Sequence, residues 1–222
     1  MKKKSAPLSL FLATLMAVAA FLLSCAAIPE APPSAKFKNS SIKITKALIP
    51  DGRFGRHKTH FMRPRFITIH STQNTGGGAD ARTHARPLQR GGLKSEHNSL
   101  GFLTWHFTVD DHSIYQTLPA NEQGQHADYG GTGNRKSLGI EMCENAGNSR
   151  AATLDRTARL TAELMRRYNI PLRNVVSHQH WERIRFDDGK NLGQKNCPHF
   201  LMTNGKPGPK WDSFLAQIKG YL

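Results

Sequence analysis

The stretch Val175–Pro198, VVSHQHWERIRFDDGKNLGQKNCP, begins as a short apolar run that ends on His178 and finishes at Cys197. The β-branched residues at its start predict a strand, so a sheet would fix the direction of the histidine that follows. Imidazole and thiolate are the donors that zinc prefers in a tetrahedral shell. Because two donors leave this shell incomplete, a third ligand is expected at the end of another buried strand.

A second strand of this kind is predicted at Phe66–His70, FITIH, where His70 stands at the C-terminal end. Three protein ligands leave the fourth position of zinc open for water, which is typical of a catalytic site. Three histidines, His178, His180 and His199, compete for the place beside His70 and Cys197. Of these, His178 directly follows the predicted strand.

Predicted strands alternate with predicted helices along the remaining chain. The strands are expected at Arg65–Ser71, Leu103–Asp110, Ser113–Leu118, Ser137–Cys143 and Asn174–Ser177, and the helices at Ala81–Arg90, Leu154–Tyr168 and Pro209–Leu222. The second and third strands flank Asp111-His112, which predicts a hairpin. This order predicts a single α/β domain with a central mixed sheet flanked by helices.

Ser137–Cys143, SLGIEMC, is an apolar strand interrupted by one carboxylate, Glu141. Burying an unpaired charge is costly, so the carboxylate requires a reason. Ile140 and Met142 would occupy the opposite face of the strand. We therefore expect Glu141 on the functional side of the sheet, near a zinc-bound water, although on a solvent-facing edge it would have no role.

Gln123–Arg135, QGQHADYGGTGNR, is predicted to be a long glycine-rich loop that lines a binding groove. His126 and Arg135 are candidates to contact substrate, and Trp105 in the strand LTWHFTVD is a third. Alternatively, His126 and Arg135 only hydrogen-bond the loop to itself.

The N-terminus combines a basic segment, Met1–Lys4, with an uncharged apolar run, Leu8–Leu23, that ends shortly before Cys25. The run is short for a membrane span and is typical of a signal peptide. Leu22-Leu23-Ser24-Cys25 resembles the lipobox of bacterial lipoproteins, which implies cleavage before Cys25 and acylation of its thiol. An ordinary secretory signal cut near Ala26 and an uncleaved anchor are the alternatives.

The leader divides the chain into three predicted parts. Residues 1–24 form the signal peptide, 25–41 the lipidated cysteine with an Ala/Pro-rich tether, and 42–222 the zinc domain. This organisation predicts a lipid anchor in the cell envelope. If the cell has two membranes, Ala26 after the cysteine resembles outer-membrane sorting, with the domain facing the periplasm.

The chain is strongly basic, with 31 Lys and Arg against 16 Asp and Glu and a formal net charge of +15. Without the three leader lysines the charge is +12, which favours anionic partners such as acidic wall polymers or lipid headgroups. Because no nucleic-acid reading element is recognisable, nucleic acid is not expected to be a partner. Three cysteines are too few for a disulfide scaffold.

Five motifs occur in a fixed order: IHST after a strand, WHFTVDD followed by IYQ, HADYGGTGNRKSLGIE, VVSHQHW, and KNCP. Together they resemble the zinc-dependent N-acetylmuramoyl-L-alanine amidases of the type 2 family, which includes phage endolysins and peptidoglycan recognition proteins. The resemblance covers roughly residues 65–200 and implies a fold like that of the peptidoglycan recognition proteins.

By this resemblance the ligands of one catalytic Zn²⁺ are His70, His178 and Cys197, and the catalytic residues are Glu141 and Lys195. The implied reaction is hydrolysis of the amide between the lactyl group of N-acetylmuramic acid and L-alanine, in peptidoglycan or in muropeptides. A non-catalytic peptidoglycan-binding lipoprotein is the alternative, but a binder needs neither Glu141 nor Lys195. Some relatives that only bind peptidoglycan also lack the cysteine.

The chain departs from many relatives in one spacing, since 19 positions separate His178 from Cys197. The extra residues, around Glu182–Gln194, contain the turn signal Asp187-Asp188-Gly189 and are predicted to form a surface loop. A Cys143–Cys197 disulfide is a competing possibility in an oxidising compartment, and it would remove one metal ligand.

Overall fold

The computed structural model describes residues 42–57 and 60–222. The predicted signal peptide, the lipidation at Cys25 and the tether lie outside the described residues. Among the helices of the described part, none is both long and apolar enough to cross a bilayer.

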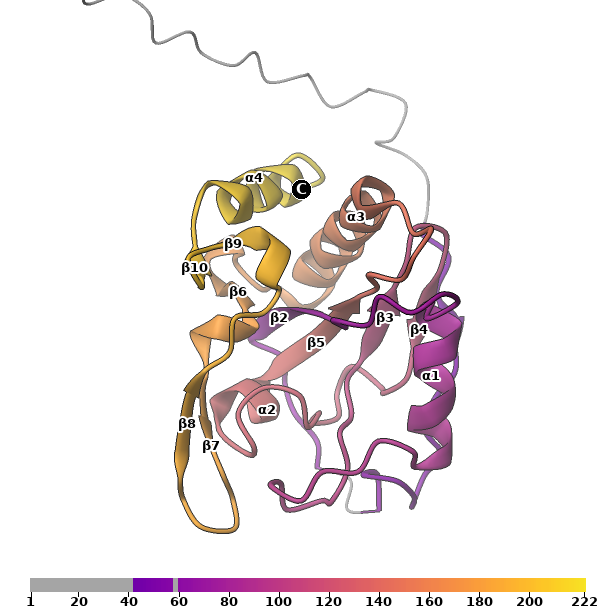
Figure 1. Ribbon diagram of the computed structural model, residues 1–222, viewed down its shortest axis with the longest axis vertical. Helices are drawn as coiled ribbons and strands as arrows, with labels where there is room; N and C mark the ends of the chain where they lie inside the picture. The colour runs from indigo at the N-terminus through magenta and orange to yellow at the C-terminus, as the bar shows by residue number, and fades with distance from the viewer. Residues whose placement is uncertain (1–41, 58–59) are drawn as a thin grey trace, which may run out of the picture. The chain divides into compact units, whose positions relative to one another are not determined.

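A mixed six-stranded sheet forms the centre of the fold, in the spatial order β1-β4-β3-β5-β2-β6. Neighbouring strands run parallel except β3 and β4, which form the predicted hairpin. Figure 1 shows β5 and β2 side by side in the middle of this sheet. The strands are β1 (Thr45–Lys46), β2 (Phe66–Ser71), β3 (Phe107–Val109), β4 (Ile114–Gln116), β5 (Ser137–Met142) and β6 (Val175–Ser177).

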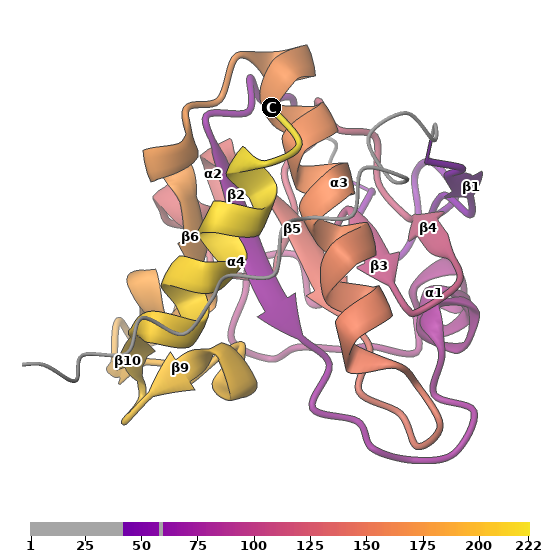
Figure 2. The same cartoon turned by 90° about the horizontal axis from the view of Figure 1, so that it is seen from above.

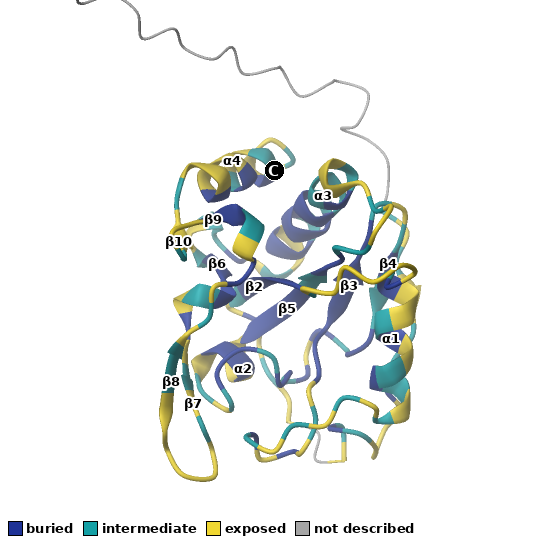
Figure 3. Ribbon diagram, in the orientation of Figure 1, coloured by how far each residue is buried: buried dark blue, intermediate teal, exposed yellow. Residues whose placement is uncertain are grey.

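Helices α3 (Arg150–Tyr168) and α4 (Pro209–Lys219) pack against each other and cover one face of the sheet (Figure 2). Their buried sides and the central strands form the main hydrophobic core (Figure 3). Helix α1 (Ala81–Arg90) packs on β3 and β4, and its Leu88 joins Trp105 in a second, smaller cluster. The predicted α/β class with a mixed sheet is confirmed.

Two short elements lie where the sequence analysis expects neither a strand nor a helix. β1 lies before the first predicted strand and pairs in parallel with β4, but its two residues are too few to show an alternating pattern. Helix α2 (Thr132–Lys136) lies in the predicted glycine-rich loop. The carboxylate of Asp128 accepts hydrogen bonds from Gly133 N at 2.6 Å and Asn134 N at 3.0 Å. These bonds cap the first turn and stabilise the helix although its first residues have poor helix propensity.

The stretch predicted as a surface loop is a β-hairpin, made of β7 (Glu182–Ile184) and β8 (Asn191–Gln194). Its turn does contain Asp187-Asp188-Gly189, with Gly189 at φ 69°. Two single-turn 3₁₀ helices, Leu172–Asn174 and His178–His180, precede this hairpin, and a third, His199–Leu201, follows it. A second small hairpin then pairs β9 (Met202–Thr203) with β10 (Lys206–Pro207).

Candidate metal and catalytic site

The sheet register brings the predicted site residues together at the C-terminal ends of parallel strands. His70 on β2 lies directly opposite Glu141 on β5, and Ile69 lies opposite Ser177, the last residue of β6. His178 therefore emerges beside His70. The nearest oxygen of Glu141 is 3.9 Å from His70 Nδ1.

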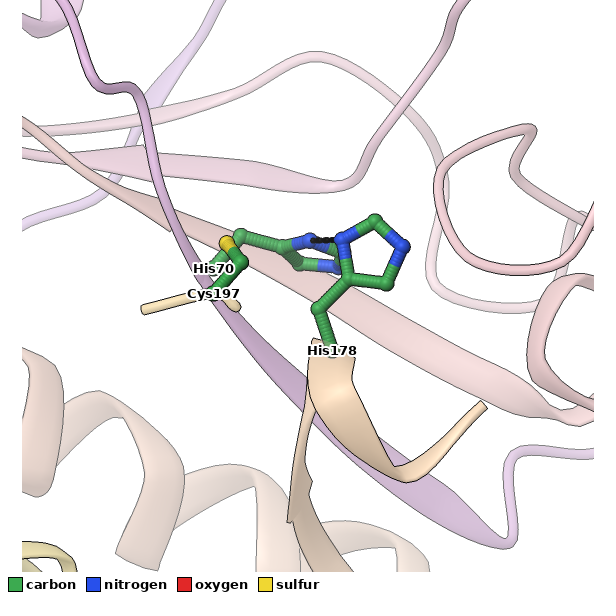
Figure 4. Close-up of side chains that lie close together, drawn as sticks. All are labelled: His70, His178 and Cys197. Carbon is green, nitrogen blue, oxygen red and sulfur yellow. Dashed lines mark hydrogen bonds between the residues drawn. The ribbon is translucent and has the colours of Figure 1, made fainter. Parts of the chain in front are cut away.

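One nitrogen of His70, one of His178 and the sulfur of Cys197 lie within 4.8 Å of one another (Figure 4). All three side chains are buried, with 1%, 6% and 1% of their surface exposed. His180 is exposed, with its ring against Trp181, and His199 is exposed beside Glu144. Neither competing histidine joins the cluster.

Cys197 and Cys143 are both free thiols, so the competing disulfide is not formed. The sulfur of Cys197 accepts a hydrogen bond from Ser71 N at 3.3 Å. Burial raises the pKa of this thiol to about 12, so a nearby cation is needed to hold it as thiolate.

Hydrogen bonds fix the tautomer of His178. Its Nε2 lies 2.9 Å from the carbonyl oxygen of Ala127, and because a carbonyl can only accept, Nε2 carries the proton. Burial lowers the pKa of His178 to about 3, so the ring is neutral. Its Nδ1 therefore holds a free lone pair.

The same reasoning fixes His70 through His126. Nε2 of His126 lies 3.4 Å from the carbonyl oxygen of Ser137 and so carries a proton, which leaves His126 Nδ1 as an acceptor. That nitrogen is 3.0 Å from His70 Nε2, which must donate to it. Burial also keeps the pKa of His70 well below its ordinary value, so the neutral ring carries its lone pair on Nδ1.

The two Nδ1 atoms of His70 and His178 face each other at 2.9 Å (Figure 4). With both lone pairs directed at the same space, a cation or a shared proton is required between them. The nearby sulfur makes the donor set two nitrogens and one sulfur, which suits zinc. The second ring nitrogen of each histidine has an acceptor, as is usual for metal-binding histidines.

Glu141 supplies a carboxylate beside this cluster. Its side chain is 15% exposed, and its Oε2 atom is buried without a hydrogen-bond partner in the described structure. Burial raises the pKa of Glu141 to about 7, against the opposing charge of Lys195. An unpartnered buried oxygen of this kind requires a partner from outside the protein, such as water.

A cavity of about 170 Å³ opens onto the cluster. His70, His178 and Glu141 line it, together with three further predicted residues, Trp105, His126 and Lys195. Arg135, the remaining predicted substrate contact, does not line this cavity, because it lies on the exposed side of α2.

Residues 60–200 match the family described as N-acetylmuramoyl-L-alanine amidase. The chain belongs to this amidase family. The match confirms the family expected from the order of the motifs.

Two curated relatives of the amidase domain come from Bacillus subtilis (strain 168). The chain is 42% identical to the N-acetylmuramoyl-L-alanine amidase XlyA over 81% of this chain and 52% of that protein. It is 40% identical to the amidase CwlH over 80% of this chain and 61% of that protein. The chain thus spans between half and two thirds of the length of these relatives.

Solved structures show the same amidase fold. A mutant endolysin from Bacillus subtilis is 42% identical and superimposes with a TM-score of 0.66, over 80% of this chain and 99% of that one. The PlyG catalytic domain is 26% identical, with a TM-score of 0.61, over 81% and 94%.

Gly139 and His106, which support the amidase site, had no predicted role. Gly139 allows the His126 ring to lie against β5, since a Cβ at this position would be 2.8 Å from the ring. His106 accepts from Gly139 N at 3.0 Å and donates to the Glu122 carbonyl at 2.8 Å, and its ring packs on that of His126. A glycine inside a predicted strand was the available signal, because it often marks close approach of another group.

Proposed function

We propose that the protein is a zinc-dependent N-acetylmuramoyl-L-alanine amidase. It hydrolyses the amide between the lactyl group of N-acetylmuramic acid and L-alanine of peptidoglycan stem peptides, which agrees with the names of its relatives. One observation carries the proposal. Two histidine lone pairs and a thiol converge beside a buried carboxylate oxygen that lacks a partner.

His70 Nδ1, His178 Nδ1 and Cys197 Sγ would hold the zinc. When bound, zinc supplies Lewis acidity and makes a water molecule more acidic. His126 and the Ala127 carbonyl keep the two imidazoles in the tautomers that ligation requires.

Glu141 acts as general base and then as general acid. Its carboxylate takes one proton from the attacking water as the new C–O bond forms, and delivers it to the nitrogen as the C–N bond breaks. Lys195 stabilises the negative charge that develops on the amide oxygen. Both groups line the same cavity, as these roles require.

We also propose that the domain acts in the cell envelope, held by a lipid on Cys25. The basic segment, the apolar run and the lipobox-like sequence of the leader support this location. The net positive charge of the chain favours binding next to acidic polymers of the envelope.

The substitution Glu141→Gln tests the proposed reaction. We expect the variant to bind one zinc per chain, like the wild type, and to lose activity by roughly 10²- to 10⁴-fold, because it lacks a general base. Purified peptidoglycan is digested with and without a chelator and with zinc restored, and mass spectrometry identifies the new ends. Unchanged turnover would refute the role of Glu141, and binding without released L-alanine ends would indicate a non-catalytic peptidoglycan binder.

A further inference from the structure

Arg183, on β7 of the hairpin, is one of the residues that line the cavity, together with His70 and Glu141. The side chain therefore borders the space that the proposed substrate enters.

The guanidinium of Arg183 is held in place but not neutralised. Its Nε donates to the Gly193 carbonyl at 3.2 Å and its Nη2 to the Leu192 carbonyl at 2.9 Å. Since a guanidinium has five N–H donors, three stay without a protein partner in the described structure, including both on Nη1. No carboxylate of the described residues pairs with Arg183.

Arg185, two residues further on, provides the contrast. It forms ion pairs with Asp187 at 2.5 Å and with Asp188 at 3.3 Å, so its charge is satisfied inside the hairpin. Arg185 is thus neutralised within the hairpin, whereas Arg183 remains available to bind an anion.

The hairpin that carries Arg183 is fixed at both ends. Glu182 pairs with Gln194 at its base, and near its tip Phe186 N donates to the His97 carbonyl at 3.0 Å. An anchored side chain loses less entropy when it binds a ligand, so Arg183 is preorganised for an anion.

The charges around the cavity leave Arg183 without a role in the hydrolysis itself. Glu141 is the single carboxylate in the lining, and Lys195 is the other cation. Lys195 stabilises the amide oxygen and Glu141 handles the proton, so Arg183 is a surplus positive charge. A planar guanidinium donates two parallel hydrogen bonds to a carboxylate, so it binds a carboxylate better than it binds a neutral group.

We infer that Arg183 binds a free carboxylate of the stem peptide and makes the enzyme selective for acidic stem peptides over amidated ones. The inference rests on the proposed function. In that substrate the lactyl carboxyl is consumed in the scissile amide and the sugars are otherwise neutral. A carboxylate within reach of the cavity must therefore belong to the peptide, on a residue that follows L-alanine.

A matched pair of substrates tests this inference. N-acetylmuramoyl-L-alanyl-D-glutamate, with its γ-carboxyl blocked as a methylamide and its α-carboxylate free, is compared with the same compound carrying an α-carboxamide, using the purified zinc-loaded protein. We expect kcat/KM to be roughly ten- to hundredfold higher for the acid, the usual range for a hydrogen bond to a charged group. The difference should lie mainly in KM, because Arg183 binds away from the reacting amide.

Three variants test whether Arg183 causes the preference. Arg183→Gln should bring the ratio of the two kcat/KM values close to one, because it lowers kcat/KM for the acidic substrate alone. Arg183→Lys, which keeps the charge but loses the fork, should give an intermediate ratio. Arg185→Gln should leave the ratio as in the wild type. Thermal unfolding and zinc content are measured for each variant.

The outcomes separate the inference from the proposed function. If the wild type cleaves neither compound, the proposed function fails. If it cleaves both equally, or if Arg183→Gln retains the preference, the inference fails while the function stands. Should Arg183→Gln not fold, the wild-type ratio and the Arg183→Lys ratio decide.

Discussion

The two walls of the catalytic cavity are built in different ways. On one wall, His70 and Glu141 stand opposite each other on central strands that are buried in the sheet. On the other, Arg183 and Lys195 belong to a two-stranded hairpin and the residue after it, in a largely exposed segment. The difference teaches that the buried sheet positions the proposed metal ligand and base, whereas a surface hairpin, anchored at its base and near its tip, supplies the cations of the cavity.

Removing a ligand from the sheet wall should have the largest effect. We expect His178→Ala to lose zinc and to reduce hydrolysis to the level of an enzyme-free control, because the remaining donors cannot complete the site. Metal analysis and peptidoglycan digestion measure both quantities. The matched control is His180→Ala, two residues away and exposed, which should keep zinc and activity. Loss of zinc in the control instead would reassign the ligand.

Gly139→Ala should have an intermediate effect, because it disturbs the support of His70 and not the ligand itself. The new Cβ would lie 2.8 Å from the His126 ring, so this ring, which accepts a hydrogen bond from His70, must shift. We expect zinc affinity to fall about 10- to 100-fold and the free energy of unfolding to fall by about 1–3 kcal/mol. Chelator competition and thermal unfolding check this.

Gly77→Ala is the control for that substitution, since no atom lies within 4 Å of a Cβ there. Zinc affinity equal to the wild type in Gly139→Ala would show that the His126 contact does not support the metal site.

Shortening the hairpin should have the smallest effect on zinc binding and on the hydrolysis that both substrates undergo. Replacing residues 183–193 by a two-residue Asn-Gly turn keeps Glu182 beside Gln194 and removes Arg183. We expect zinc affinity to stay within about threefold of the wild type, because the proposed ligands lie outside the replaced residues and distant sites act independently. The preference for the acidic substrate should disappear. A large loss of zinc would break the distinction between the two walls.

The elements that the sequence predicts well are those with local signals. The β-branched run of Phe66–Ser71 predicts β2, and the observed helix α1 has the expected bounds, Ala81–Arg90. Its ends carry ordinary signals, since Asp80 caps the N-terminus and Gly91 is left-handed at the C-terminus. The apolar stretch around Glu141 likewise predicts β5 and the direction of its carboxylate.

The parts that the sequence does not predict depend on contacts between distant residues. His106 acquires its role only because β3 and β5 are neighbours and Gly139 N points at its ring. Arg135 looks equivalent to His126 in the sequence, yet the cap made by Asp128 folds it into α2 and turns it to solvent. The hairpin shows its turn signal but not its strands, because its exposed residues lack a clear alternation.

Glu182 and Gln194 pair at the base of the hairpin, so the chain leaves and re-enters the domain at neighbouring points. Exposed segments whose ends meet in this way tolerate insertion and exchange. Segments of other length and sequence can therefore replace this hairpin during evolution without altering the sheet. Such replacements would change which substrates are preferred while His70, His178 and Glu141 stay in place.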